Sequence, residues 1–290
     1  MLPAAAELPA RRFWQQVRRD RAGTAGFGLL AVITLAAVLG PLLLSGDPGA
    51  PHLEEAFLSP GLRHPLGTDH LGRDLLVRIV YGARVSLLTA AGALGLGLLV
   101  GVPVGLVAGT ARGAADEVLM GATEVLMSFP GALLAILAVA VLGPGIRNVV
   151  LAVGVASTPV FARLVRGVAL GLREREFVEA ARALGASGPR IVAQHILPGC
   201  LAPIVVAAML RLGVTIVTVA GLGFLGLGGD PATPEWGAML SQGQEFLRRA
   251  PHIAMAPGLA ILLVVLSVNL AGDALADALD PRVRAQRAAG

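Results

Sequence analysis

Long apolar stretches alternate with polar segments along the whole chain. Each apolar stretch approaches the roughly 20 residues that an α-helix needs to cross a bilayer. The pattern therefore predicts an all-α polytopic membrane protein with six transmembrane helices. The predicted spans cover about residues 25–44, 85–109, 118–142, 148–168, 201–222 and 253–270.

Composition supports the same class. Apolar residues make up 55% of the 290-residue chain, mean hydropathy is +0.76, and only 14% of residues are charged. A soluble domain carries about 25% charged residues. The single cysteine, Cys200, excludes an internal disulfide and a multi-cysteine metal site. The N-terminus has no short apolar core followed by a small-residue cleavage site, so we expect no cleaved signal peptide.

The positions of the arginines orient these spans. The map places 15 of the 23 basic residues, all arginine, in inner segments and 7 in outer segments, with Arg211 inside a span. Positive charge favours the cytoplasmic side, so both chain ends are predicted to be cytoplasmic. We divide the chain into an N-terminal segment (1–24), a first span (25–44), an outer segment (45–84), a core with the other five spans (85–273) and a C-terminal tail (274–290).

The second span carries glycines at four-residue intervals, Gly97, Gly101, Gly105 and Gly109. In water each glycine weakens a helix by about 1 kcal/mol. In lipid the same spacing gives a flat face that another helix can approach closely. We therefore expect this stripe to be a helix-packing face.

The polar segment 173–198 lies between the fourth and fifth spans and predicts a helix–turn–helix. Helix-forming residues run to Leu184, and Gly185 stands where a helix C′ glycine is expected. Ser187 and Pro189 favour a new helix start, and this second helix should stop before Pro198. Phe177, Ala180, Ala181 and Leu184 share one face of the first helix, which is either a docking surface or a cover for the protein itself.

The amino-acid sequence of this segment resembles the EAA loop of ABC importer permeases. The matching residues are Glu179, Ala180, Ala181, Gly185, Ile196, Leu197 and Pro198. The resemblance implies that the segment is a coupling loop, which fits into a groove on a cytoplasmic ATPase subunit. The general pattern has isoleucine where this chain has His195. The sequence from His195 to Pro198 resembles the peptide and nickel branch of the family.

Further motifs resemble the dipeptide/oligopeptide/nickel permeases, DppC/OppC type. They are HPLGTD (64–69), GRD (72–74), GARVSL (82–87), FLGLG (224–228), TPEWGAM (233–239) and DPR (280–282). The resemblance implies the type I ABC importer permease fold in a bacterial inner membrane. It also implies a heterodimer with a sister permease, two ATPase subunits and an external substrate-binding protein. The implied substrates are di- or oligopeptides, with nickel, glutathione or an opine as alternatives.

The chain contains no lysine and no P-loop, so it cannot hydrolyse ATP itself. ATP and Mg²⁺ are expected on the partner subunits, with no cofactor in this chain and no nucleic-acid partner. A secondary carrier would need several membrane-embedded acids, and only Glu124 qualifies. A membrane enzyme would need a catalytic cluster, and no Ser/His/Asp or HExxH arrangement is present.

Charged side chains of the outer segment are candidates for a vestibule on which a binding protein docks. We expect Asp69, Arg73, Asp74, Arg78 and Arg84 to form ion pairs there. Trp236 is expected to anchor the outer membrane interface rather than to stack on substrate. His52, His64 and His70 with Asp69 also permit a metal site, but the Pro and Gly residues between them favour turns.

Two ionisable residues lie inside predicted spans and are candidates for the translocation pathway. A charge at the centre of a span costs about 2.5–3.5 kcal/mol on insertion scales, so it usually faces a cavity or a partner. Glu124 is expected to pair with an arginine of a neighbouring helix. Arg211 is expected to meet a peptide carboxylate, to pair with Glu124, or to pair with the sister subunit.

Overall fold

The computed structural model describes residues 20–44, 46–111 and 113–279. These residues form helices and connecting turns, with one isolated antiparallel bridge between Thr68 and Asp74. Most of the predicted N-terminal segment and C-terminal tail lies outside them. The elements are α2 (Arg21–Leu43), η1 (Leu53–Glu55), α3 (Leu75–Thr110), α4 (Ala114–Met127), α5 (Gly131–Leu142), α6 (Ile146–Arg173), α7 (Glu176–Ala183), α8 (Gly188–Ile191), η2 (Val192–Ile196), α9 (Leu197–Phe224), α10 (Trp236–Gln244) and α11 (His252–Leu279).

Five described helices are long and apolar enough to span a membrane, and a sixth span forms if the bent pair α4–α5 is counted as one. The five are α2, α3, α6, the continuous helix Gly188–Phe224 and α11. The predicted all-α class and span count are therefore confirmed. The helix of the second span begins ten residues before the predicted start at 85, because α3 runs from Leu75.

The third span differs from the prediction of one helix over 118–142. It is broken into α4 and α5, whose axes bend by 88°. Pro130 lies at the break and provides no N–H for an intrahelical bond. Phe129, as the residue before a proline, is also disfavoured in the helical region. The two halves consequently end and begin near the middle of the predicted span.

The second helix of the 173–198 segment also differs, because it does not stop before Pro198. Leu197 keeps helical dihedrals, and its N–H donates to the Val192 carbonyl across a π-helical turn, η2. Membrane helices tolerate proline where such a wider turn accommodates the missing hydrogen bond. α8, η2 and α9 therefore form one helix that joins the polar loop rigidly to the fifth span.

The glycine stripe of α3 packs against α6, as predicted, and these two helices form the most extensive pairing in the molecule. A methyl group added at Gly101 would lie 2.6 Å from the Thr158 carbonyl oxygen and 2.8 Å from Phe161 Cβ. Gly97, Gly105 and Gly109 face Ser157, Val165 and Ala169 in the same way. Backbone contact at this distance is possible only because the glycines lack side chains.

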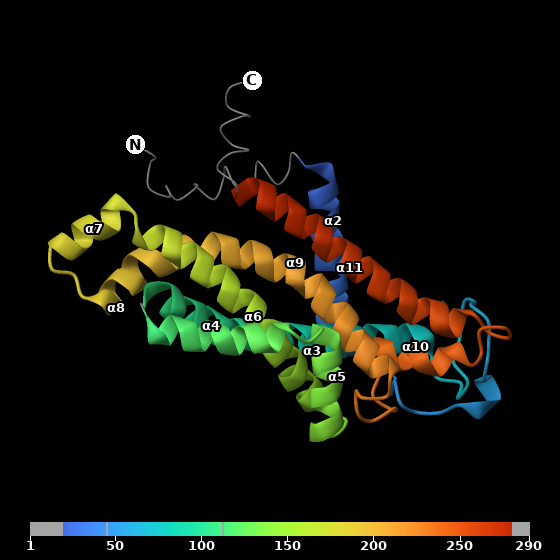
Figure 1. The fold of residues 1–290 in the computed structure, drawn as a ribbon. Coiled ribbons are helices and arrows are strands. Elements are labelled where there is room, and N and C mark those ends of the chain that lie inside the picture. The colour runs from blue at the N-terminus through green and yellow to red at the C-terminus, as the bar shows by residue number, and fades with distance from the viewer. Residues whose placement is uncertain (1–19, 45, 112, 280–290) are drawn as a thin grey trace.

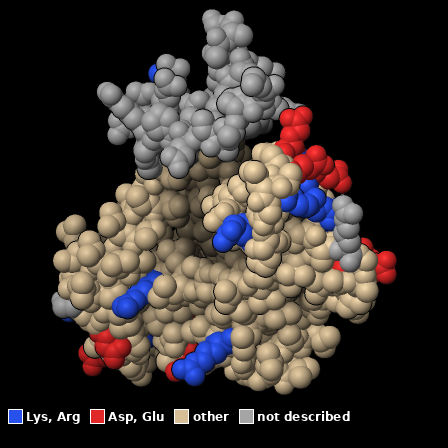
Figure 2. All heavy atoms as spheres, turned by 90° about the vertical axis from the view of Figure 1, so that its left-hand side faces the viewer, with Lys and Arg blue, Asp and Glu red and all other residues tan. Residues whose placement is uncertain are grey.

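The polar elements gather at opposite ends of the bundle. α7 and α8 lie at one end, and α10 with the 50–74 segment lies at the other (Figure 1). The face at the α7–α8 end is hollowed near its middle, with arginine and acidic side chains around the hollow (Figure 2). The fold thus separates the predicted coupling loop from the predicted outer vestibule by the length of the spanning helices.

Candidate functional site

The predicted coupling helix α7 is held by one buried side chain, Val178. Val178 is fully buried among Val165 and Ala169 of α6 and Ile196 and Cys200 of the following helix. Apolar burial of this kind fixes the position of α7 relative to the spans. Val178 was not among the predicted coupling residues, although an apolar residue on a helix rich in Glu and Arg is the signal of a buried position on an amphipathic helix.

Gly185 ends α7 in the left-handed conformation, with φ of 84°, as predicted. Ala186 N–H donates to Ala181 O and Gly185 N–H donates to Arg182 O, both at 3.0 Å. These two bonds form a Schellman motif, which turns the chain sharply away from the helix. A residue with a side chain is strained at this backbone geometry.

The remaining coupling-loop residues divide between surface and core. Glu179 and Ala180 are exposed, and Phe177 and Leu184 expose 48% and 89% of their surface on the predicted apolar face. The other three residues are less exposed: Ala181 and Leu197 are half-buried, and Ile196 is buried under α7. The exposed surface of the predicted coupling loop is therefore formed by α7 and Pro198, while Ile196 packs beneath them.

An ion pair that the sequence analysis missed links α4 to α6. Arg166 Nε and Nη2 donate to the two carboxylate oxygens of Asp116 at 2.6 and 2.7 Å. Arg173 Nη1 donates to Gly109 O at 3.3 Å, at the end of α3. Two parallel hydrogen bonds between a guanidinium and a carboxylate fix the relative orientation of the two groups as well as their separation. The ends of α3, α4 and α6 are therefore held together near α7.

At the other end, Asp69 and Arg73 form the predicted ion pair, but inside the protein. Arg73 Nε donates to Asp69 Oδ2 at 2.6 Å, and both side chains are at most 4% exposed. Arg78 Nε lies 3.6 Å from the same oxygen, and its Nη1 donates to Pro48 O at 2.8 Å. This buried network ties the outer segment to α3 and does not itself present a docking surface.

Asp74 also has a different role from the one expected. Asp74 Oδ1 caps α3 by accepting from Val77 N–H at 3.0 Å, and its Oδ2 contacts His64 Nδ1 at 2.7 Å. Arg84 is exposed on the third turn of α3, and no ion pair of Arg84 with another described residue is present, so its predicted pairing stays a prediction.

Trp236 is not an interface anchor, because only 1% of its surface is exposed. Its indole Nε1 donates to Ile79 O at 3.0 Å, and a methyl group added at Gly82 would lie 2.9 Å from Trp236 Cδ1. The missing side chain of Gly82 provides the space that the ring occupies. Trp236 therefore locks α10 onto α3.

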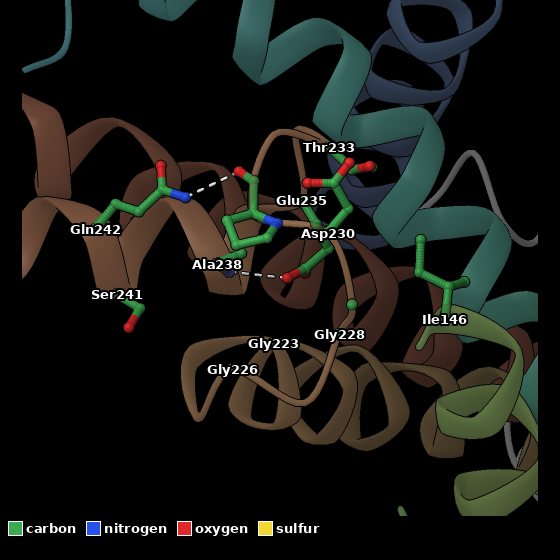
Figure 3. Close-up of a pocket in the computed structure, with 12 residues that line it drawn as sticks. Ile146, Gly223, Gly226, Gly228, Asp230, Thr233, Glu235, Ala238, Ser241 and Gln242 are labelled. Atoms are coloured by element: carbon green, nitrogen blue, oxygen red, sulfur yellow. Dashed lines mark hydrogen bonds between the residues drawn. The ribbon is translucent and has the colours of Figure 1, made fainter. Parts of the chain in front are cut away.

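Glu235 borders a cavity of about 170 Å³ in the outer Gly- and Pro-rich segment (Figure 3). Its carboxylate caps α10, accepting from Gly237 N–H at 2.9 Å and Ala238 N–H at 2.8 Å. Ser86 Oγ of α3 donates to it at 3.2 Å. Burial raises the pKa of Glu235, in opposition to these hydrogen bonds. The sequence analysis quoted Glu235 within a motif but assigned it no role.

Of the two pathway candidates, Arg211 faces a cavity. Glu124 is exposed on α4 and interacts electrostatically with Arg166 of the neighbouring helix α6, without a salt bridge within 4 Å among the described residues. Arg211 lines a cavity of about 200 Å³ between α5, α6 and α9. Its Nε is buried and has no described hydrogen-bond partner. An unpaired guanidinium in an apolar setting marks a place where an anion is favoured.

The histidines of the outer segment have partners other than a metal ion. His64 lies between Asp74 and Glu55, with Nε2 3.5 Å from the Glu55 carboxylate. His70 stacks on Phe246 at 5.2 Å between ring centroids, and burial lowers its pKa. Among the described residues, no three His, Cys, Asp or Glu side chains are grouped as metal ligands.

Sequence comparison places the whole chain in one family. Residues 101–285 match the family described as "Binding-protein-dependent transport system inner membrane component", and residues 9–60 match the "N-terminal TM domain of oligopeptide transport permease C". The glutathione transport system permease protein GsiD of Pectobacterium atrosepticum is 43% identical over 95% of this chain and 92% of that protein. The dipeptide transport system permease protein DppC of Alkalihalophilus pseudofirmus is 41% identical over 95% and 91%.

Solved structures agree on the fold. Two inward-facing structures of the MetNI methionine ABC transporter match with TM-scores of 0.58 and 0.55, at 22% and 24% identity. The matches cover 70% and 71% of this chain and 96% and 98% of the chains compared. The chain therefore belongs to the binding-protein-dependent transport system inner membrane components, as the transmembrane permease subunit of an ABC importer.

Proposed function

We propose that this permease forms half of the pathway through which an ATP-driven importer takes up di- or oligopeptides. The observation that carries the proposal is 41% identity to a dipeptide permease over nearly the whole chain. Glutathione is the second candidate substrate, because a glutathione permease is 43% identical over a similar length. Both substrates are short peptides with free carboxylates, so the two candidates share one chemistry.

The proposed complex contains a sister permease, two ATPase subunits and an extracytoplasmic binding protein. This chain has neither lysine nor a P-loop, so ATP and Mg²⁺ belong on the ATPase subunits. α7 is the proposed contact with an ATPase, since Phe177, Ala180 and Leu184 form an exposed apolar patch beside Glu179. Binding shifts a conformational equilibrium only through differential contacts, and the rigid helix from Gly188 to Phe224 transmits the motion of the loop into the bundle.

Reconstitution of the complete complex in liposomes tests this function. With ATP inside the vesicles and loaded binding protein outside, we expect uptake of labelled dipeptide that stops when ATP is omitted. The same vesicles receive glutathione in a parallel assay. Uptake of neither peptide, from a complex that retains ligand-stimulated ATP hydrolysis, would contradict peptide import.

Gly185→Ala tests the coupling role of α7, with Gly188→Ala as the matched control. Gly185 has positive φ, so the added methyl group costs about 1–2 kcal/mol and disturbs the end of α7. A methyl group at Gly188 meets no atom within 4 Å, and Gly188 does not have positive φ. We expect Gly185→Ala alone to weaken ATPase co-purification or binding-protein-stimulated hydrolysis. Normal attachment, hydrolysis and uptake in Gly185→Ala would remove α7 as the coupling element.

A further inference from the structure

The cavity beside Arg211 is formed by three helices. Arg211, Val214, Thr215 and Thr218 share one face of α9, and Ser157 of α6 lies opposite. Small residues, among them Gly131 and Ala132 of α5, leave a volume of about 200 Å³. One water molecule occupies about 30 Å³ in the liquid, so the cavity has room for more than a single water.

Among the described residues, the only charge that lines this cavity is positive. Arg211 is its sole ionisable lining residue among those described, and no carboxylate faces it. The guanidinium Nε is buried and donates to no described acceptor. Thr215 and Thr218 donate their hydroxyl protons to the backbone oxygens of Arg211 and Val214, both at 2.9 Å, and a neutral hydroxyl is not a counter-charge. An anion entering the cavity would gain a charge-assisted partner.

The break in the third span adds a second positive end. α5 begins at Gly131, so the N–H groups of Gly131 and Ala132 precede the first bond of the helix, which Leu134 donates to Pro130 O. No side chain caps this end. Free N–H groups and the helix dipole both favour an anion at a helix N-terminus. The bend thus directs a half-helix toward the cavity that already contains the unpaired arginine.

We propose that Arg211 and the first turn of α5 form a subsite for the carboxylate of a transported peptide. The inference rests on the proposed peptide-import function. A planar carboxylate matches the two-pronged donor geometry of a guanidinium. Every linear peptide with a free C-terminus carries this group whatever its sequence, so the subsite recognises the substrate class and not a particular side chain. Arg211 lies about half-way along α9, deep between the two ends of the bundle.

The test compares dialanine with dialanine amide in the complete transporter reconstituted in liposomes. Rates are expressed per loaded binding protein, because the binding protein can itself select for a free carboxylate. Arg211→Gln should slow dialanine translocation roughly tenfold or more, the loss of a charge-assisted hydrogen bond, and leave dialanine amide unchanged. Arg211→Lys should retain part of the dialanine translocation rate, since lysine keeps the positive charge but lacks the two parallel N–H donors of the guanidinium. Arg147→Gln, an exposed arginine at the start of α6, is the matched control.

Two outcomes would overturn the subsite. Arg211→Gln could leave the ratio of the two rates at the wild-type value, whether or not both rates fall, or it could fail to co-purify with the sister permease while Arg147→Gln assembles normally. The last result would make Arg211 an interface residue. A wild-type complex that imports neither probe would instead reject the proposed function, and the subsite with it.

Discussion

Glu235 illustrates how single residues determine the outer end of this permease. Its carboxylate is 5% exposed and joins the start of α10 to Ser86 of α3. Ser86 Oγ also accepts from the backbone N–H of Trp236 at 3.2 Å, so one hydroxyl contacts both the capping carboxylate and the first residue of α10. A buried carboxylate is tolerated only when its oxygens are satisfied, and these donors provide that. The outer loop is thereby fixed on the spanning helices.

The raised pKa of Glu235 predicts a pH dependence of stability. Because the folded-state pKa lies above the ordinary value of 4.5, the stability associated with this group is full below that value and is lost as pH rises through the folded-state pKa. Glu235→Gln stays neutral, so its thermal midpoint in detergent should fall less than that of wild type as pH rises from about 4 to about 7. Exposed Glu245→Gln should follow wild type. Parallel curves for wild type and Glu235→Gln would refute the assignment.

At the scale of the elements, the α3–α6 pair is the frame on which the other helices are arranged. Its close approach requires glycine at every fourth position of α3, and the inner ends are joined by the contact of Arg173 with Gly109 O. α4 is attached to this frame through Asp116 and Arg166. The bent α4–α5 pair and the π turn before α9 are departures from regular helix, and each is located at a proline.

Gly101→Ala tests this frame, and Gly95→Ala on the same helix is the control. A methyl group at Gly101 overlaps Thr158 O and Phe161, whereas one at Gly95 meets nothing within 4 Å. Overpacking of a close interface costs about 1–3 kcal/mol. We expect a lower thermal midpoint for Gly101→Ala and an unchanged or slightly higher one for Gly95→Ala. Equal midpoints would mean that the two helices can separate without loss of stability.

At the scale of the whole molecule, the two polar ends lie far apart. α7, the proposed ATPase contact, lies at one end, and the 50–74 segment with α10 forms the opposite end (Figure 1). Arg211 lies between them. Substrate-dependent signalling must therefore pass along the bundle, and the continuous helix from Gly188 to Phe224 runs from the loop region through the level of Arg211.

Cysteine labelling in intact cells tests the proposed orientation. With Cys200 replaced by alanine, single cysteines at the exposed positions Ser59 and Ala232 should react with a membrane-impermeant maleimide. Cysteines at Ser187, in the loop after α7, and at Ala288, outside the described residues, should react only after the membrane is opened. Labelling of Ser187 in intact cells would reverse the topology, with the coupling loop outside.

Sequence alone determined the features that depend on local chemistry. Apolar length predicted the spans, the four-residue glycine spacing predicted a packing face, and Gly185 predicted the end of α7. The effect of proline was not predicted at either position: the third span is broken at Pro130, where one helix was expected, and the helix continues through Pro198, where an end was expected. Neighbouring turns decide whether the missing N–H can be accommodated.

Only the tertiary structure decided which polar side chains are buried and with what partner. Asp69, Arg73 and Trp236 look like surface residues in sequence. The Asp69–Arg73 pair is local, but its burial depends on other elements, and the carbonyl that accepts from the Trp236 indole belongs to α3. The unpaired state of Arg211 and its position opposite the start of α5 depend in the same way on helices distant in sequence. Spans follow from residues near one another in the chain, whereas burial and pairing follow from contacts that exist only after the helices have packed.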